Sequence, residues 1–325
     1  MPDTSNLSIS EAILSGRSFT PSEFPTSGFA ALSAAGSIPE LAFEALAPYF
    51  AGDKLFSPLA EICCEAFDFP IPIAEVAPNC RALELFAGPG QSYVDFGARF
   101  IVSIMQRLNP GAVLTAEIHK PSEAAAWTRA LAGKEMTLFL TGVKVCPGLP
   151  QNVSVCDSAP AGAICVDERN TAFIMGLSVP FIYCALHQAI SEDRIRPSKE
   201  IFLTHFALPA CNQALQAAVF FARAIGAPIG RVLLACRKDH GIKAFLDGKA
   251  PAPAVLSLLL KYFSEEEVKE TVLAGTPDDE AVVKAIERVT EKTGYCLSRH
   301  GAVLEAARFA LLPVHRTVLA VTGPQ

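Results

Sequence analysis

The sequence predicts an α/β protein built on doubly wound parallel sheet. Stretches typical of buried strands and of helices alternate along most of the 325 residues, and such alternation indicates a parallel sheet covered by helices on both faces. About half of the residues (51%) are hydrophobic and only 18% are charged, which suits a sheet that is buried on both sides. The length allows one large or two medium domains with substantial cores.

The predicted elements follow one another in strand and helix order after residue 80. They are a strand at 83–86, a helix at 95–108, strands at 111–117 and 136–140 around a helix at 122–131, short β pieces at 153–155 and 163–166, a helix at 179–190, a strand at 200–206, helices at 212–225, 281–290 and 302–311, and a strand that begins at 318. Residues 1–80 predict an N-terminal helical segment instead, in which Ser8 and Glu11 begin a helix and prolines punctuate later ones.

Charge and cysteine content narrow the class of ligand. The formal net charge is −6 and Lys and Arg form no cluster, so we expect a small-molecule ligand and no nucleic acid. The ten cysteines form no C-x-x-C pair, which predicts no metal site and favours reduced thiols in a cytoplasmic protein. The N-terminus has no basic region followed by an apolar one, so no secretory signal is predicted.

Two uncharged runs, at residues 171–191 and 201–222, are long enough to span a bilayer. Pro180 and His187 interrupt the first run, and proline, asparagine and glutamine residues interrupt the second. We therefore interpret both runs as core elements and predict no membrane association. Assembly into a homo-oligomer is left open.

Residues 83–97 are the stretch around which the chain is organised. A buried strand leads into Gly88-Pro89-Gly90, and a helix follows from near Asp95, which we expect to be its N-cap. A glycine-containing loop before a helix brings backbone amides close to a small anionic group. The stretch therefore predicts a ligand site in this loop.

The same stretch resembles the active-site signature of the threonine synthase family, which reads E-L-F-H-G-P-T-x-A-F-K-D-F-G. Residues 225–235 are similar to the family's M-G-L-P-I-x-R-F-x-x-A, and 295–303 to its Y-L-L-D-P-H-T-A-V. The resemblance spans roughly residue 38 to the C-terminus. It implies the tryptophan-synthase-β-like fold, known as fold type II of pyridoxal-phosphate (PLP) enzymes, with two interleaved doubly wound lobes in residues 81–325 and the smaller lobe at about 95–180.

The motifs that hold PLP in that family are altered in this chain. The family's lysine, which forms the Schiff base with PLP, is replaced by Val94. The two cofactor loops correspond to 117–121 and 211–215 and contain no glycine, and Val321 stands where the family has a hydroxyl facing the pyridine nitrogen. The resemblance together with these changes predicts that no cofactor is bound and that ordinary threonine synthase activity is absent.

Three residues in these altered motifs are candidates for catalysis. His119 could serve as general acid or base because imidazole titrates near neutrality. Lys120 is the one lysine in a motif loop that could replace the missing one. Cys211 precedes a predicted helix, where the pKa of a thiol is lowered. Each has a structural alternative: solvent-exposed loop residues for His119 and Lys120, and a buried thiol for Cys211.

Further polar groups are candidates for substrate binding. The loop residues Gln91, Ser92 and Tyr93 carry amide and hydroxyl groups that suit a small polar ligand. Asn212 is retained from the family's phosphate-binding turn, and His300 from its Y-L-L-D-P-H-T-A-V motif. The substrate-binding set is completed by Gly88 and Gly90, through their backbone amides.

Three functional hypotheses follow. The one we favour is a threonine-synthase-like protein repurposed as a PLP-independent enzyme, with lyase, isomerase or cyclase chemistry on a small metabolite in a specialised biosynthetic pathway. The second is a catalytically inactive relative that binds or regulates another protein, which predicts a collapsed apolar cleft. The third is a residual PLP-dependent amino-acid lyase that uses another lysine.

Overall fold

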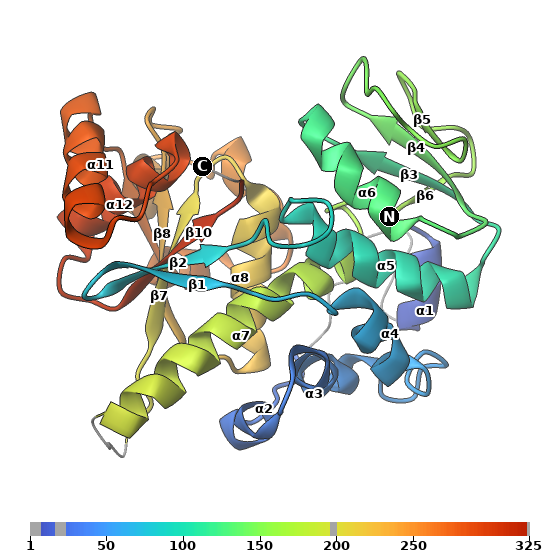
Figure 1. The fold of residues 1–325 in the computed structure, drawn as a ribbon, viewed down its shortest axis with the longest axis horizontal. Coiled ribbons are helices and arrows are strands. Elements are labelled where there is room, and N and C mark those ends of the chain that lie inside the picture. The colour runs from blue at the N-terminus through green and yellow to red at the C-terminus, as the bar shows by residue number, and fades with distance from the viewer. Residues whose placement is uncertain (1–7, 17–23, 196–199, 324–325) are drawn as a thin grey trace. The chain divides into compact units, whose positions relative to one another are not determined.

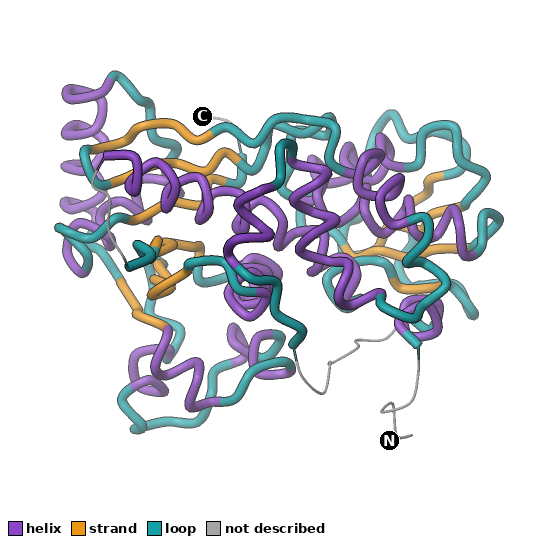
Figure 2. Tube along the Cα trace, turned by 90° about the horizontal axis from the view of Figure 1, so that it is seen from below, coloured by secondary structure: helices purple, strands orange, loops and turns teal. Residues whose placement is uncertain are grey.

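The computed structural model describes residues 8–16, 24–195 and 200–323 (Figure 1). The chain forms two compact units: unit 1 comprises residues 1–70, 86–180 and 224–226, and unit 2 comprises 71–85, 181–223 and 227–325. The strands accordingly gather in two separate groups (Figure 2). Unit 1 thus contains most of the predicted N-terminal segment together with the lobe predicted at about 95–180.

Unit 1 is built on a four-stranded parallel sheet in the order β5-β4-β3-β6. Its strands are β3 (Val113–Glu117), β4 (Thr137–Thr141), β5 (Val153–Val155) and β6 (Ile164–Cys165). Leu114 of β3 lies in register with Leu138 of β4 and Ile164 of β6. Because the strands are parallel, their carboxyl ends lie at one edge of the sheet, where α/β proteins commonly bind ligands.

The helices of unit 1 are α1 (Ile9–Leu14), α2 (Phe29–Ala34), α3 (Ile38–Phe50), α4 (Leu59–Ala66), α5 (Val94–Leu108), α6 (Ala124–Ala130) and the first part of α7 (Thr171–Ile195), with a short 3-10 turn at Pro121–Glu123. The predicted start of α1 is confirmed as a capping box between Ser8 and Glu11. Phe67 stacks on Phe100 of α5 with ring centroids 5.8 Å apart, and both rings are buried in the core.

Unit 2 is built on a six-stranded sheet in the order β1-β2-β10-β7-β8-β9. Its strands are β1 (Ile73–Ala77), β2 (Cys80–Glu84), β7 (Thr204–Pro209), β8 (Ile229–Ala235), β9 (Val272–Gly275) and β10 (Thr317–Val321). Only β1 pairs antiparallel with its neighbour; the other pairs are parallel. All five residues of β10 are buried, as expected for a central strand.

Helices cover both faces of the unit 2 sheet (Figure 1). They are the end of α7, α8 (Gln213–Ile225), α9 (Ile242–Leu246), α10 (Glu265–Thr271), α11 (Asp279–Thr293) and α12 (Arg299–Leu311), with 3-10 turns at Ala254–Leu256 and Leu259–Lys261. Within this layer, Glu305 of α12 is fully buried and accepts hydrogen bonds from Arg308 and, at 2.9 Å, from Arg288 of α11. This charged cluster fixes the two helices against each other.

Several elements differ from the prediction. The strand predicted at 83–86 is β2 at Cys80–Glu84, and β9 was not among the predicted strands. The hairpin of β1 and β2 begins inside the stretch 1–80 that was predicted to be helical, because Pro70 and Pro72 end the helical pattern there. Helix α7 begins at Thr171 rather than 179, and it contains Pro180. The strand predicted at 200–206 begins at Thr204, and residues 201–203 before it are exposed.

Helix α7 contains the first of the two apolar runs that are long enough to span a bilayer. Residues Thr171–Arg194 are long and apolar enough to cross a bilayer, but 83% of their apolar window is buried inside the protein. That burial is what a core helix of a soluble protein shows, and it agrees with our interpretation of the run as a core element.

Candidate functional site

The loop that precedes α5 is held by its own hydrogen bonds. The backbone N–H of Gly90 donates to both carboxylate oxygens of Asp95, each at 3.0 Å, and the N–H of Ser92 donates to the same carboxylate at 3.3 Å. The N–H of Gln91 donates to the carbonyl of Gly88 at 2.9 Å, and the hydroxyl oxygen of Ser92 accepts from the N–H of Val94 at 3.3 Å. These amides are therefore not free to bind a ligand.

The two glycines of the loop are required by packing. A Cβ atom on Gly90 would lie 2.3 Å from the Cα of Ala126 in α6, and one on Gly88 would lie 2.7 Å from the side chain of Asp95. Burial raises the pKa of the Asp95 carboxyl, and the Gly90 and Ser92 amides oppose that effect. Asp95 is thus a structural residue as expected, but it lies in the first turn of α5 and is not its N-cap.

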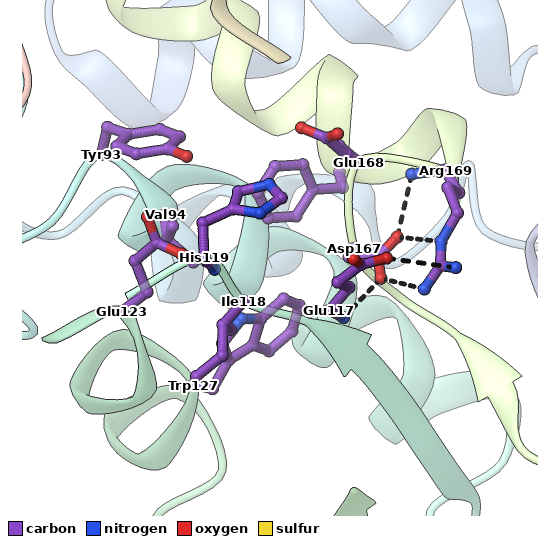
Figure 3. A pocket seen from close by; sticks show the side chains of 11 residues that line it. Tyr93, Val94, Glu117, Ile118, His119, Glu123, Trp127, Asp167, Glu168 and Arg169 are labelled. Atoms are coloured by element: carbon purple, nitrogen blue, oxygen red, sulfur yellow. Dashed lines mark hydrogen bonds and ion pairs between the residues drawn. The ribbon is translucent and has the colours of Figure 1, made fainter. Parts of the chain in front are cut away.

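The first cavity of interest lies in unit 1, at the carboxyl ends of β3 and β6 (Figure 3). Its volume is about 40 Å³, and it is lined by Tyr93, Val94, Glu117, Ile118, His119, Glu123, Trp127, Asp167, Glu168, Arg169 and Phe173. By this measure a water molecule needs roughly 10–15 Å³. The cavity therefore has room for a small group and not for an aromatic ring.

Aromatic packing explains the small volume. Trp127 of α6 and Phe173 of α7 stack with their ring centroids 5.9 Å apart, and both side chains are almost completely buried. Val94 is buried beside them at the start of α5. Val94, which we predicted to stand at the family's lysine position, therefore lines the cavity together with these two aromatic side chains.

Most of the carboxylates that line the first cavity have partners. Asp167 accepts from Nε and Nη2 of Arg169 at 2.9 and 2.6 Å and from the backbone N–H of Glu117 at 2.6 Å. Burial opposes ionisation of Asp167, but these hydrogen bonds outweigh it and lower the pKa of the carboxyl. Glu117 forms an ion pair with Arg169 at 3.6 Å, and Glu123 accepts from the backbone N–H of His119 at 2.8 Å.

The second cavity lies in unit 2, at the carboxyl ends of β7 and β8 and the start of α12. Its volume is about 380 Å³, and it is lined by Pro209, Cys211, Ala235, Cys236, Arg237, Lys238, His240, Arg299, His300, Val303 and Leu304. Five of these side chains are basic or can become so, and no acidic residue lines the cavity. Its apolar lining comes from Pro209, Ala235, Val303 and Leu304.

The basic side chains of the second cavity are largely unpaired. Arg237 forms an ion pair with Asp279. In the part of the chain that the structure describes, the side chains of Lys238, Arg299 and His300 form no ion pair or hydrogen bond. Arg299 and His300 form the first turn of α12, where the helix dipole is positive. The cavity can therefore attract an anionic group.

The structure separates the predicted site residues into two sets. Tyr93 and His119 line the first cavity, and Cys211 and His300 line the second. Lys120 is exposed and lines neither of them.

The remaining predicted residues lie outside the two cavities. Gln91 is exposed with a positive φ of 54°. The side-chain oxygen of Asn212 accepts from the N–H of Leu215 at 3.0 Å and caps α8. The N–H of Gly90 is bonded within its own loop, and the carbonyl of Gly88 accepts the N–H of Gln91. Substrate binding by these two glycines stays a prediction.

Sequence reasoning missed most of the charged lining. Glu168 lies in the charged run Asp167-Glu168-Arg169 that follows β6, and Arg237, Lys238 and His240 follow β8 directly. Charged residues immediately after a buried strand were the available signal, because the carboxyl ends of parallel strands meet at one edge.

Comparisons with known proteins identify the fold. No family model matches the chain. Threonine synthase from Serratia marcescens is 41% identical over 54 residues, and that from Escherichia coli (strain K12) is 38% identical over 71 residues. These stretches cover 16% and 21% of this chain and only 13% and 17% of the two relatives.

Solved structures extend the likeness to nearly the whole chain. The crystal structure of Escherichia coli threonine synthase superposes with a TM-score of 0.78 at 19% identity, covering 98% of this chain and 86% of that one. This chain has the threonine synthase fold. The yeast enzyme gives a TM-score of 0.72 at 17% identity, covering 99% and 85% of the two chains. The resemblance and the type II fold of PLP enzymes are therefore confirmed.

The expectation of no cofactor has to be corrected. Threonine synthase from Brucella melitensis was solved with PLP bound. It superposes with a TM-score of 0.68 at 16% identity, covering 98% of this chain and 86% of that one. The expectation was drawn from four altered motifs, at Val94, residues 117–121, residues 211–215 and Val321. The PLP-bound structure of the same fold overturns it, because a type II fold binds the cofactor in that protein.

Proposed function

We propose that this threonine-synthase-like protein binds a phosphate-bearing small molecule in the second cavity. PLP is the reference ligand, because a protein of the same fold was solved with it. The observation that carries the proposal is the gathering of Arg237, Lys238, His240, Arg299 and His300 around one cavity of about 380 Å³. Ligand sites in proteins typically enclose about 300–1,000 Å³.

The second cavity fits the phosphate end of such a ligand. Guanidinium and ammonium groups form the strongest hydrogen bonds to phosphate oxygens, and Arg299 and Lys238 have no competing carboxylate partner in the described part of the chain. The amides in the first turn of α12 add positive potential. The apolar side chains of Val303 and Leu304 would pack against the uncharged part of the ligand.

The chemistry that PLP could support here depends on whether a lysine amine lies beside it. When bound, PLP supplies an electron sink for a substrate carbanion. No lysine lines the first cavity, where Val94 is buried, whereas Lys238 lines the second. Lys238 would orient the ligand through its charge, and it is our candidate amine for the hypothesis of an amino-acid lyase that uses another lysine.

The alternative of a catalytically inactive partner protein receives less support. That hypothesis predicts a collapsed apolar cleft, and the aromatic packing beside Val94 in the small first cavity fits it, but the second cavity is open and basic. A ligand-binding role in small-molecule metabolism is therefore the better proposal. We also propose a cytoplasmic location, because all ten cysteines are free thiols.

Equilibrium dialysis of the full-length protein against PLP and against pyridoxal, which lacks the phosphate, tests this proposal. We expect PLP to bind at least about tenfold more tightly than pyridoxal, because charge-assisted hydrogen bonds contribute roughly 1.5–3 kcal/mol. Arg299→Ala should weaken PLP binding by about tenfold or more. The matched control is Lys292→Ala, which removes an exposed positive charge from α11.

Two results would contradict the proposal. One is equal affinity of the wild-type protein for PLP and pyridoxal, or no binding of either. The other is unchanged PLP binding by Arg299→Ala while the variant keeps the circular dichroism spectrum of the wild type.

A further inference from the structure

Glu168 lines the first cavity and differs from the three other carboxylates there, which have ion-pair or hydrogen-bond partners. Asp167 and Glu117 are paired with Arg169, and Glu123 holds the backbone of His119. Among the described residues, the Glu168 carboxyl has no hydrogen bond or ion pair, although most of the residue is buried. A mostly buried carboxyl without a protein partner is costly, so a structural role does not explain it.

His119 is the histidine that lines the first cavity together with Glu168. It follows β3 directly, and the bond from its backbone N–H to Glu123 fixes the loop that carries it. Its ring extends into the first cavity, where Figure 3 shows it directed toward the Glu168 carboxylate. The ring forms no hydrogen bond within the described part of the chain, so both of its nitrogens remain available to a ligand.

The surroundings of Glu168 raise the pKa of its carboxyl above the ordinary value. Burial is the main cause that raises the pKa of this carboxyl, and the charges of Asp167 and Glu117 raise it further. The charges of His119 and Arg169 act in the opposite direction. A carboxyl with a raised pKa beside an imidazole is an arrangement suited to donating and accepting a proton at neutral pH.

We propose that His119 and Glu168 form a proton-transfer pair, with His119 as general base and Glu168 as general acid, for a small carbonyl compound that carries an ammonium group. The proposal concerns a different cavity from the phosphate site and goes beyond the proposed function. Both residues belong to unit 1, and both line one cavity.

The proposed step transfers one proton to His119 and one proton from Glu168. A ring nitrogen of His119 takes a proton from the carbon next to the substrate carbonyl, and the electron pair of that C–H bond moves to form the enol double bond. The carbonyl oxygen receives the proton of Glu168. The products are the enol, a protonated His119 and an ionised Glu168, and the reverse step returns the starting state with no other reactant.

The charge and size of the cavity select the substrate class. Besides the proton donor Glu168, three carboxylates and one guanidinium line it, so a carboxylate or phosphate would be repelled, whereas an ammonium group would be attracted. With about 40 Å³ available, only the reacting end of a metabolite enters.

Deuterium exchange in D2O tests the pair without knowledge of the natural substrate. The probe is aminoacetone, a small ketone with an ammonium group, and exchange at its C–H bonds is followed by proton NMR. We expect the full-length protein to accelerate this exchange above buffer, and His119→Gln and Glu168→Gln each to lower the rate by about 100-fold, since a positioned acid or base contributes roughly 10²–10⁴-fold. Neutral propanone should exchange more slowly than aminoacetone, and anionic pyruvate more slowly still.

Matched controls separate catalysis from misfolding. Glu135→Gln removes an exposed carboxylate of unit 1 outside the cavity and should exchange aminoacetone at the wild-type rate. PLP binding in the second cavity should be unchanged in His119→Gln, which shows that the variant is folded. The proposal is overturned if the wild-type protein exchanges aminoacetone no faster than buffer, if His119→Gln retains the full rate, or if pyruvate exchanges as fast as aminoacetone.

Discussion

At the scale of single residues, Gly90 shows that packing alone can require a glycine in the loop before α5. The backbone of Ala126 in α6 occupies the space that a side chain at residue 90 would need, with 2.3 Å between the Cα of Ala126 and a Cβ on Gly90. We expect Gly90→Ala to lower the free energy of unfolding by about 1–3 kcal/mol, because overpacking against backbone forces a shift. Urea titration followed by circular dichroism measures this change.

The control at the same scale is Gly111→Ala. A Cβ on Gly111 would meet nothing within 4 Å, and this residue has no positive φ. We expect its effect on the free energy of unfolding to stay within about 0.5 kcal/mol. Equal destabilisation by the two substitutions would show that the contact between Gly90 and Ala126 is not tight.

At the scale of elements, the start of β7 carries a histidine, His205, whose protonation links the free energy of unfolding to pH. The pairing of β7 with β8 shifts register between Thr204 and Phe206, and Nδ1 of His205 accepts the N–H of Arg231 at 2.7 Å. The rings of His205 and His315 lie 5.3 Å apart between centroids. Burial lowers the pKa of His205, and the charges of His315 and Arg231 lower it further.

The sign of the pH effect follows from this lowered pKa. Above about pH 6.5, the ordinary pKa of histidine, His205 is neutral in both the folded and the unfolded chain. As the pH falls below this value, the unfolded chain binds the proton first, so the free energy of unfolding decreases until the folded pKa is passed. We expect His205→Asn, which keeps an acceptor, to lose less stability than the wild type between pH 7.5 and 5.5.

Urea titrations at the two pH values measure the difference, and His187→Asn is the control because His187 is exposed on α7. If His205→Asn loses as much stability on acidification as the wild type, another group carries the pH dependence.

At the scale of the whole molecule, the fold could be predicted because its signals are local and redundant. The strand–helix alternation and the stretch 83–97 were sufficient for the fold class. The two units could not be outlined from the sequence, because each is assembled from three separate segments. The start of α7 at Thr171 was missed because Pro180 inside the helix suggested a boundary.

The candidate site was predictable only in part, for a related reason. His119 and His300 stood in recognisable motifs, but Glu168 and the basic residues after β8 reach their cavities through the topology of the sheets. The role of Asp95 in binding the amides of its own loop depends on side-chain direction, which spacing does not reveal.

The most direct test of the central proposal is a crystal structure of the full-length protein grown with PLP. We expect difference density for a phosphate group in the second cavity, beside Arg299 and His300. Density for the ligand anywhere else in the molecule, or an empty second cavity at a PLP concentration that saturates the protein in dialysis, would contradict it.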